Sequence, residues 1–97
     1  MSIKPSQRKR LRSLAHHLKP IVNIGKEGLT EGVVHFIADA LEKHELLKIK
    51  FSKNKDNKKN ISEQIIDETN SFQVSIIGNI LIIFKQSENP KNRHIKI

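Results

Sequence analysis

Two glycines separated by two residues form the motif with the clearest chemical meaning in this chain. They frame the run Gly25-Lys26-Glu27-Gly28, and Thr30, a residue type that often caps helices, follows shortly after. Glycine lets the backbone turn sharply and approach a partner closely. A helix N-terminus presents unpaired N–H groups and the positive end of the helix dipole, and both favour phosphate. The run therefore predicts a phosphate-binding loop, although such glycine pairs also occur in plain strand-to-helix connections.

Basic residues gather in three segments of the 97-residue chain, whose formal net charge is +8. Residues 1–20 hold six Lys or Arg and no acid, residues 48–59 hold six lysines and one acid, and residues 85–97 hold four basic residues and one acid. Such clusters predict a polyanionic partner, and nucleic acid fits them better than a membrane. Outside the glycine loop, the side chains that we expect to contact this partner are Arg8, Lys9, Arg10, Arg12, Lys19, Lys48 and Lys50.

Residues that could support catalysis or metal binding lack the spacing that these functions need. His16 and His17 are adjacent, so on a helix their side chains point about 100° apart and make poor joint ligands. The chain has no cysteine, no Gly-x-Ser-x-Gly run and no Walker-type phosphate loop. We therefore expect no enzyme activity, no metal and no cofactor. The lack of cysteine fits a reducing compartment, so we expect a cytoplasmic protein. The longest unbroken apolar run, Ile80 to Phe84, is far too short to cross a bilayer, so we expect no membrane partner.

Aromatic residues are too few to form a base-stacking surface. The sequence has no Tyr or Trp, and its phenylalanines fall at positions that we interpret as core, namely Phe36, Phe51, Phe72 and Phe84. Recognition should then depend on phosphate and sugar contacts rather than on stacked bases. This favours structured RNA, recognised by the shape of its backbone, over a sequence-specific DNA site.

Helices and strands alternate in the pattern that must position these residues. Apolar periodicity predicts helices at residues 6–18 and 30–44, and a third helix that ends near Asn70. In the first helix, we expect one buried stripe of Leu11, Leu14, Ala15 and Leu18. Apolar runs predict strands at residues 21–24, 46–51, 72–76 and 80–85. A polar loop covers residues 52–60.

The order α-β-α-β-α-β-β predicts a single compact α/β domain with three helices and one mixed four-stranded sheet. Helical connections should make the first three strands parallel. Gly78-Asn79 predicts a hairpin that adds an antiparallel strand, and the apolar run after it suits an inner strand. We expect residues 1–87 to form the domain and residues 88–97 to form a basic, flexible tail.

Several runs of this chain together resemble the CRM domain family, and within it the stand-alone bacterial proteins of YhbY type. These runs are Gln7-Arg8, Leu11-Arg12, Leu14-Ala-His-His-Leu-Lys-Pro20, Ile24-Gly-Lys-Glu-Gly-Leu-Thr30, His44-Glu-Leu-Leu-Lys-Ile-Lys50 and Val74-Ser-Ile-Ile-Gly-Asn-Ile-Leu-Ile-Ile-Phe84. The resemblance covers residues 6–87. It implies an RNA-binding domain with a fold like the C-terminal domain of bacterial translation initiation factor three.

The resemblance also implies a role and a site. Stand-alone members associate with precursors of the large ribosomal subunit, so we expect a monomer that binds ribosomal RNA during assembly of that subunit. Gly25 to Gly28 match the RNA-contacting loop of the family, and the basic residues of the first helix match its adjoining surface. Glu27 is unfavourable near phosphate, at a position where the family pattern varies. The alternative is a general nucleic-acid or protein-interaction module without a ribosomal role, in which neutralising Lys26 would change little.

Overall fold

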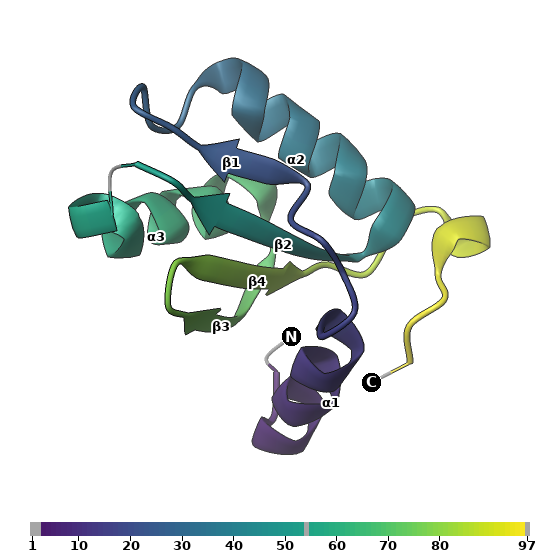
Figure 1. Ribbon diagram of the computed structural model, residues 1–97. Helices are drawn as coiled ribbons and strands as arrows, with labels where there is room; N and C mark the ends of the chain where they lie inside the picture. Colours follow the sequence, from purple (N-terminus) through teal and green to yellow (C-terminus); the bar gives the residue numbers. More distant parts are fainter. Residues whose placement is uncertain (1–2, 54, 97) are drawn as a thin grey trace.

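The elements follow the expected order in a computed structural model that describes residues 3–53 and 55–96, without the side chain of Lys55 (Figure 1). The helices and strands are α1 (Pro5–Ala15), β1 (Val22–Ile24), α2 (Glu31–His44), β2 (Leu46–Phe51), α3 (Lys58–Thr69), β3 (Phe72–Ile77) and β4 (Ile80–Phe84). Two short 3-10 helices, η1 (Lys55–Asn57) and η2 (Pro90–Asn92), complete the set. Met1, Ser2, Asn54 and Ile97 belong to segments that the sequence analysis assigns, and they lie outside the described residues.

The sheet confirms the mixed α/β fold. Its four strands lie in the order β1-β2-β4-β3, with β1 parallel to β2 and β4 antiparallel to both of its neighbours. The strands that follow helices therefore run in one direction, and β4 returns between two of them after a hairpin in which Gly78 has a φ of 58°. β4 is paired with a strand on each edge, and its residues from Leu81 to Phe84 pack alternately into the clusters on the two faces, so all four are buried, as the unbroken apolar run predicted.

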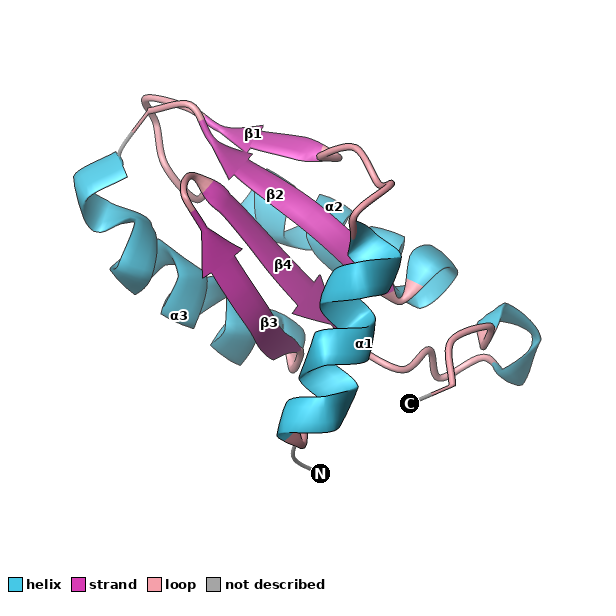
Figure 2. Ribbon diagram, turned by 60° about the horizontal axis from the view of Figure 1, so that its bottom comes forward, coloured by secondary structure: helices cyan, strands magenta, loops and turns pink. Residues whose placement is uncertain are grey.

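Helices cover both faces of the sheet, with α1 on one face and α2 and α3 on the other (Figure 2). Leu11 of α1 belongs to one buried cluster, and Ile37 of α2 and Ile65 of α3 belong to the other. Successive residues of β2, Leu46 and Leu47, pack into these two different clusters. This is the alternation that a strand between two helical layers requires.

The first helix differs from its prediction at both ends. It begins at Pro5 rather than Ser6, because proline suits the first helical position. It ends at Ala15 rather than at residue 18, and the Leu18 N–H donates to the Ala15 carbonyl (3.0 Å) in a tight turn. Leu18 lies beyond the helix and is 39% exposed. Leu14 lies in the helix at the side of the buried Leu11 and Ala15 and is 42% exposed, so the buried stripe was predicted too wide.

Phe36 was also assigned wrongly to the core, since its side chain is 53% exposed. The buried stripe of α2 contains Ile37 and Leu41. Phe36 lies about 100° around the helix from Ile37 and so points to the side of that stripe. The prediction relied on residue type, but the position of Phe36 on the helix determines its exposure.

The C-terminal segment, residues 86–96, is held against the domain by a buried carboxylate. Glu45, between α2 and β2, is fully buried and has a φ of 65°. Its carboxylate accepts hydrogen bonds from the N–H groups of Ser87 (2.8 Å), His94 (2.8 Å) and Ile95 (3.3 Å). The sequence predicts a flexible tail at residues 88–97, whereas in the structure the N–H groups of His94 and Ile95 are bonded to Glu45.

Candidate nucleic-acid interface

The glycine loop connects the end of β1 to the start of α2. Its base is fixed because the Ile24 carbonyl accepts hydrogen bonds from the N–H groups of Ser52 (3.1 Å) and Lys53 (3.2 Å), which follow β2. Within the loop, the Gly28 N–H donates to the Gly25 carbonyl at 3.1 Å. The loop is therefore a tight turn that is anchored to the end of the sheet.

The two glycines of the loop differ in why the fold needs them. Gly28 has a φ of 71°, a backbone angle that residues with a Cβ rarely adopt. Gly25 does not have a positive φ, and a Cβ built on it would meet nothing within 4 Å in the described part of the chain. The fold explains a glycine at position 28 but not at position 25. A missing side chain at position 25 would instead help a partner to approach the backbone.

The N-terminus of α2 lies directly behind the loop. Thr30 caps it as predicted, because its Oγ1 accepts a hydrogen bond from the Val33 N–H at 3.2 Å. Lys26 and Glu27 are exposed in the loop, and Glu31 is exposed in the first helical turn. The helix dipole and Lys26 favour an anion here, and the two carboxylates weaken that preference.

Lys48 and Lys50 extend the basic surface from the loop towards α1. They lie two residues apart in β2 on either side of the buried Ile49, so both point to the face of the sheet that carries α1. Lys50 is in register with Asn23, close to the start of the loop. The Lys48 Nζ donates to the carbonyl of His16, directly after α1, at 3.3 Å.

Arg10, Arg12 and Lys19 join Lys48 around two hollows beside α1. Arg12 and Lys48 line the smaller hollow, and Arg10, Lys19 and Lys48 line the larger one. The Nε of Arg10 also donates to the Lys96 carbonyl at 2.9 Å. The structure therefore brings these four predicted residues together on one side of the molecule.

Arg8 and Lys9 are the predicted residues that stand apart. Arg8 is half-buried and Lys9 is exposed, and neither lines either hollow. The structure also places His44, His94 and Lys96 around the larger hollow, and the sequence did not indicate these three residues. Only the tertiary fold brings His94 and Lys96 to α1, since a contact across more than 80 residues leaves no local pattern.

Other kinds of site receive no support from the residues that the structure describes. Among residues 3–53 and 55–96, no group of three or more His, Cys, Asp or Glu side chains is placed to hold a metal ion. No helix in the same part of the chain is long and apolar enough to cross a membrane.

A small basic α/β domain with a glycine loop at a helix N-terminus has the features of an RNA-binding module. The sequence profile of the CRS1 / YhbY (CRM) domain matches residues 3–85. The chain belongs to this family, as the resemblance predicted.

Related proteins cover nearly the whole chain. A protein of Haemophilus influenzae named "RNA-binding protein" is 42% identical over 91 residues, which are 93% of this chain and 92% of that protein. The "Probable RNA-binding protein YqeI" of Bacillus subtilis is 37% identical over 86 residues, 88% of this chain and 90% of that protein. The solution structure of a hypothetical Staphylococcus aureus protein matches with a TM-score of 0.78 and 36% identity, covering 97% of this chain and 99% of that one. The two named relatives carry RNA-binding names, and neither name describes an enzyme.

Proposed function

We propose that this protein binds structured ribosomal RNA and takes part in assembly of the large ribosomal subunit. The observation that carries the proposal is the basic surface that runs from the glycine loop along Lys50 and Lys48 to α1. The names of the related proteins support RNA as the nucleic acid. The family resemblance is the basis for the ribosomal role.

In this proposal, the loop contacts the sugar–phosphate backbone. Gly25 lets the RNA approach the main chain, and Gly28 provides the turn that exposes it. Lys26 pairs with a phosphate near the α2 N-terminus, where the helix dipole adds to the attraction. Glu27 lies beside this contact and limits its strength, so the loop alone does not account for the affinity.

The remaining cations enlarge the contact surface. Lys48 and Lys50 bind phosphates beside the loop, and Arg10, Arg12 and Lys19 continue the surface along α1. Arg8 and Lys9 add positive charge at the start of α1, outside the two hollows. Such contacts read the shape of the backbone rather than base sequence.

In this proposal, the protein acts without catalysis, as a cytoplasmic monomer. Residues 1–87 form the RNA-binding unit, and residues 88–97 extend it. The RNA recognised is folded, because a rigid sheet and helix surface fits a fixed arrangement of phosphates better than a flexible single strand.

Sedimentation of cell extracts tests the ribosomal part of the proposal. The tagged protein should appear in the fractions that contain precursors of the large subunit. The Lys26→Glu variant should shift towards the free fractions, because charge reversal repels phosphate and weakens binding. Lys43→Glu makes the same change at an exposed position of α2 away from the loop and should sediment like the wild type. Wild-type protein that stays at the top of the gradient would refute the ribosomal role.

A further inference from the structure

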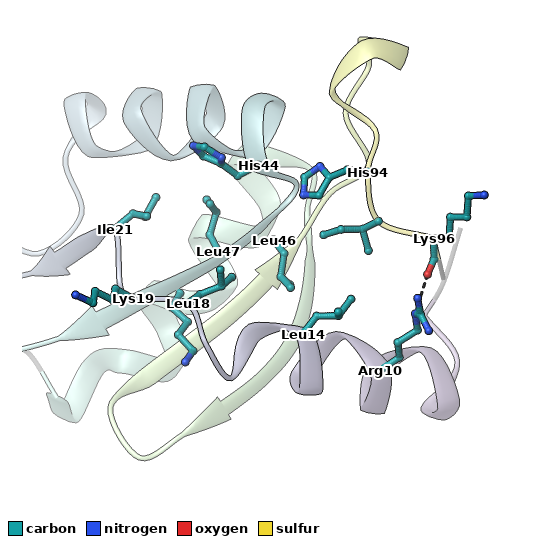
Figure 3. Close-up of a pocket in the computed structure, with 12 residues that line it drawn as sticks. Arg10, Leu14, Leu18, Lys19, Ile21, His44, Leu46, Leu47, His94 and Lys96 are labelled. Carbon is teal, nitrogen blue, oxygen red and sulfur yellow. Dashed lines mark hydrogen bonds between the residues drawn. The ribbon is translucent and has the colours of Figure 1, made fainter.

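An apolar groove opens between the end of α1, the start of β2 and the C-terminal segment (Figure 3). It has a volume of about 470 Å³, and its apolar side chains include Leu14, Leu18, Ile21 and Ile95. We call it the leucine groove because Leu14 and Leu18 are 42% and 39% exposed there. Large apolar side chains that stay exposed around a hollow are typical of a binding site.

Cations surround the leucine groove, and no Asp or Glu lines it in the described part of the chain. Arg10, Lys19, Lys48 and Lys96 all line it. The hydrogen bond from Arg10 to the Lys96 carbonyl, drawn as a dashed line in Figure 3, ties α1 to the C-terminal segment. An apolar floor with a cationic rim complements a ligand that joins a flat apolar group to negative charges.

The wall of the groove is a fixed part of the fold. Glu45 holds His94 and Ile95 in place through their N–H groups, at 2.8 and 3.3 Å. His94 and Ile95 both line the leucine groove. The buried carboxylate thereby shapes a surface that it does not itself reach.

We propose that the leucine groove binds one unpaired nucleotide of the RNA. The base lies against Leu14 and Leu18, and the phosphates on either side of it pair with Arg10, Lys19 and Lys48. The inference rests on the proposed function and adds a base contact to a surface that otherwise meets only the backbone.

Two observations select a nucleotide as the occupant. Three of the rim cations, Arg10, Lys19 and Lys48, belong to the proposed RNA surface, so an RNA bound there passes directly over the groove. The volume of about 470 Å³ lies in the range of sites for small organic groups. A flat membrane surface would not reach the floor of such a hollow.

The test compares two RNA hairpins that differ only at one unpaired position. One carries 2-aminopurine there, and the other carries an abasic site with the same phosphates. Burying the apolar face of a base against leucine favours binding, so the wild type should bind the hairpin with the base about fivefold or more tightly, and the 2-aminopurine fluorescence should change on binding. The variant Leu14→Gln/Leu18→Gln should bind both hairpins equally. Phe36→Gln, which alters a more exposed apolar residue outside the groove, should keep the preference.

The outcomes separate this inference from the proposed function. If the wild type binds neither hairpin, the RNA-binding proposal fails. If it binds both with equal, salt-dependent affinity, the RNA-binding proposal stands, the groove inference is overturned, and a protein partner becomes the occupant to test. Equal binding of the two hairpins by the wild type overturns the inference even if the double variant does not fold.

Discussion

Replacing Glu45 by Gln should destabilise the protein, because this side chain joins two parts of the chain that are distant in sequence. The Glu45 carboxylate is fully buried and accepts hydrogen bonds from Ser87, His94 and Ile95. The Nδ1 atom of His94 also lies 3.4 Å from Oε1 of Glu45. Gln has nearly the same shape but lacks the charge and one of the two acceptor oxygens.

The hydrogen bonds set the size of the expected effect. The amide oxygen of Gln can replace Oε1, which faces His94 and Ile95. Its NH₂ group must then face the Ser87 N–H, so two donors meet where a donor and an acceptor met before. Losing one buried hydrogen bond to a charged group costs about 2 kcal/mol. In a domain of this size, that lowers Tm by about 8–16 °C.

The pH dependence gives a second readout. Burial alone would raise the pKa of Glu45, but the N–H groups of His94, Ser87 and Ile95, together with the His94 ring, lower it below the ordinary value of 4.5. A carboxylate with a lower pKa in the folded state stabilises the fold above its unfolded pKa. That stability is lost as the pH falls through the folded pKa. The difference between wild type and Glu45→Gln should therefore shrink below about pH 4.5.

Thermal and urea unfolding between pH 3 and pH 7 measure both effects. Glu63→Gln, which removes an exposed carboxylate from α3, is the control and should change stability by less than about 0.5 kcal/mol. Equal Tm values for Glu45→Gln and the wild type at pH 7 would refute the reasoning. A stability difference that stays constant between pH 7 and pH 3 would also refute it.

Three substitutions around the glycine loop give further predictions. Thr30→Ala removes the cap of α2 and should cost about 1 kcal/mol in urea unfolding, and an unchanged midpoint would contradict the role of the Thr30–Val33 hydrogen bond. Gly28→Ala forces a Cβ into a φ of 71° and should cost about 1–2 kcal/mol in the same assay. Gly25→Ala should keep or raise stability, by about 0.4–1 kcal/mol, while weakening RNA binding in a filter-binding assay. Full RNA affinity in Gly25→Ala would show that close approach at this position is not needed.

The order of elements could be predicted because it depends on local patterns. Alternating or continuous apolar residues marked the strands, and the run from Ile80 to Phe84 was apolar enough to indicate an inner position. The loop was also predictable, since Gly28 and Thr30 are residue types that a turn and a helix cap require. These features need no knowledge of which segments pack together.

The leucine groove and the role of Glu45 could not be predicted from such patterns. Glu45 directly follows α2, and its partners lie 42 to 50 residues further on. Leu14 and Leu18 fit a helical stripe, but the helix ends before Leu18, and Leu14 lies at the side of the buried Leu11 and Ala15. Both features arise from how distant segments pack, which periodicity does not report.

The affinity of the protein for structured RNA and for duplex DNA of equal length, measured across salt concentrations, tests the central claim most directly. Each phosphate contact should contribute about −0.7 to −0.9 to the slope of log affinity against log salt. We predict tighter binding to RNA, and a loss of about 1 from the slope in Lys26→Ala but not in Lys43→Ala. Weak binding to both nucleic acids, with Lys26→Ala unchanged, would contradict the account and show that the basic surface serves another partner.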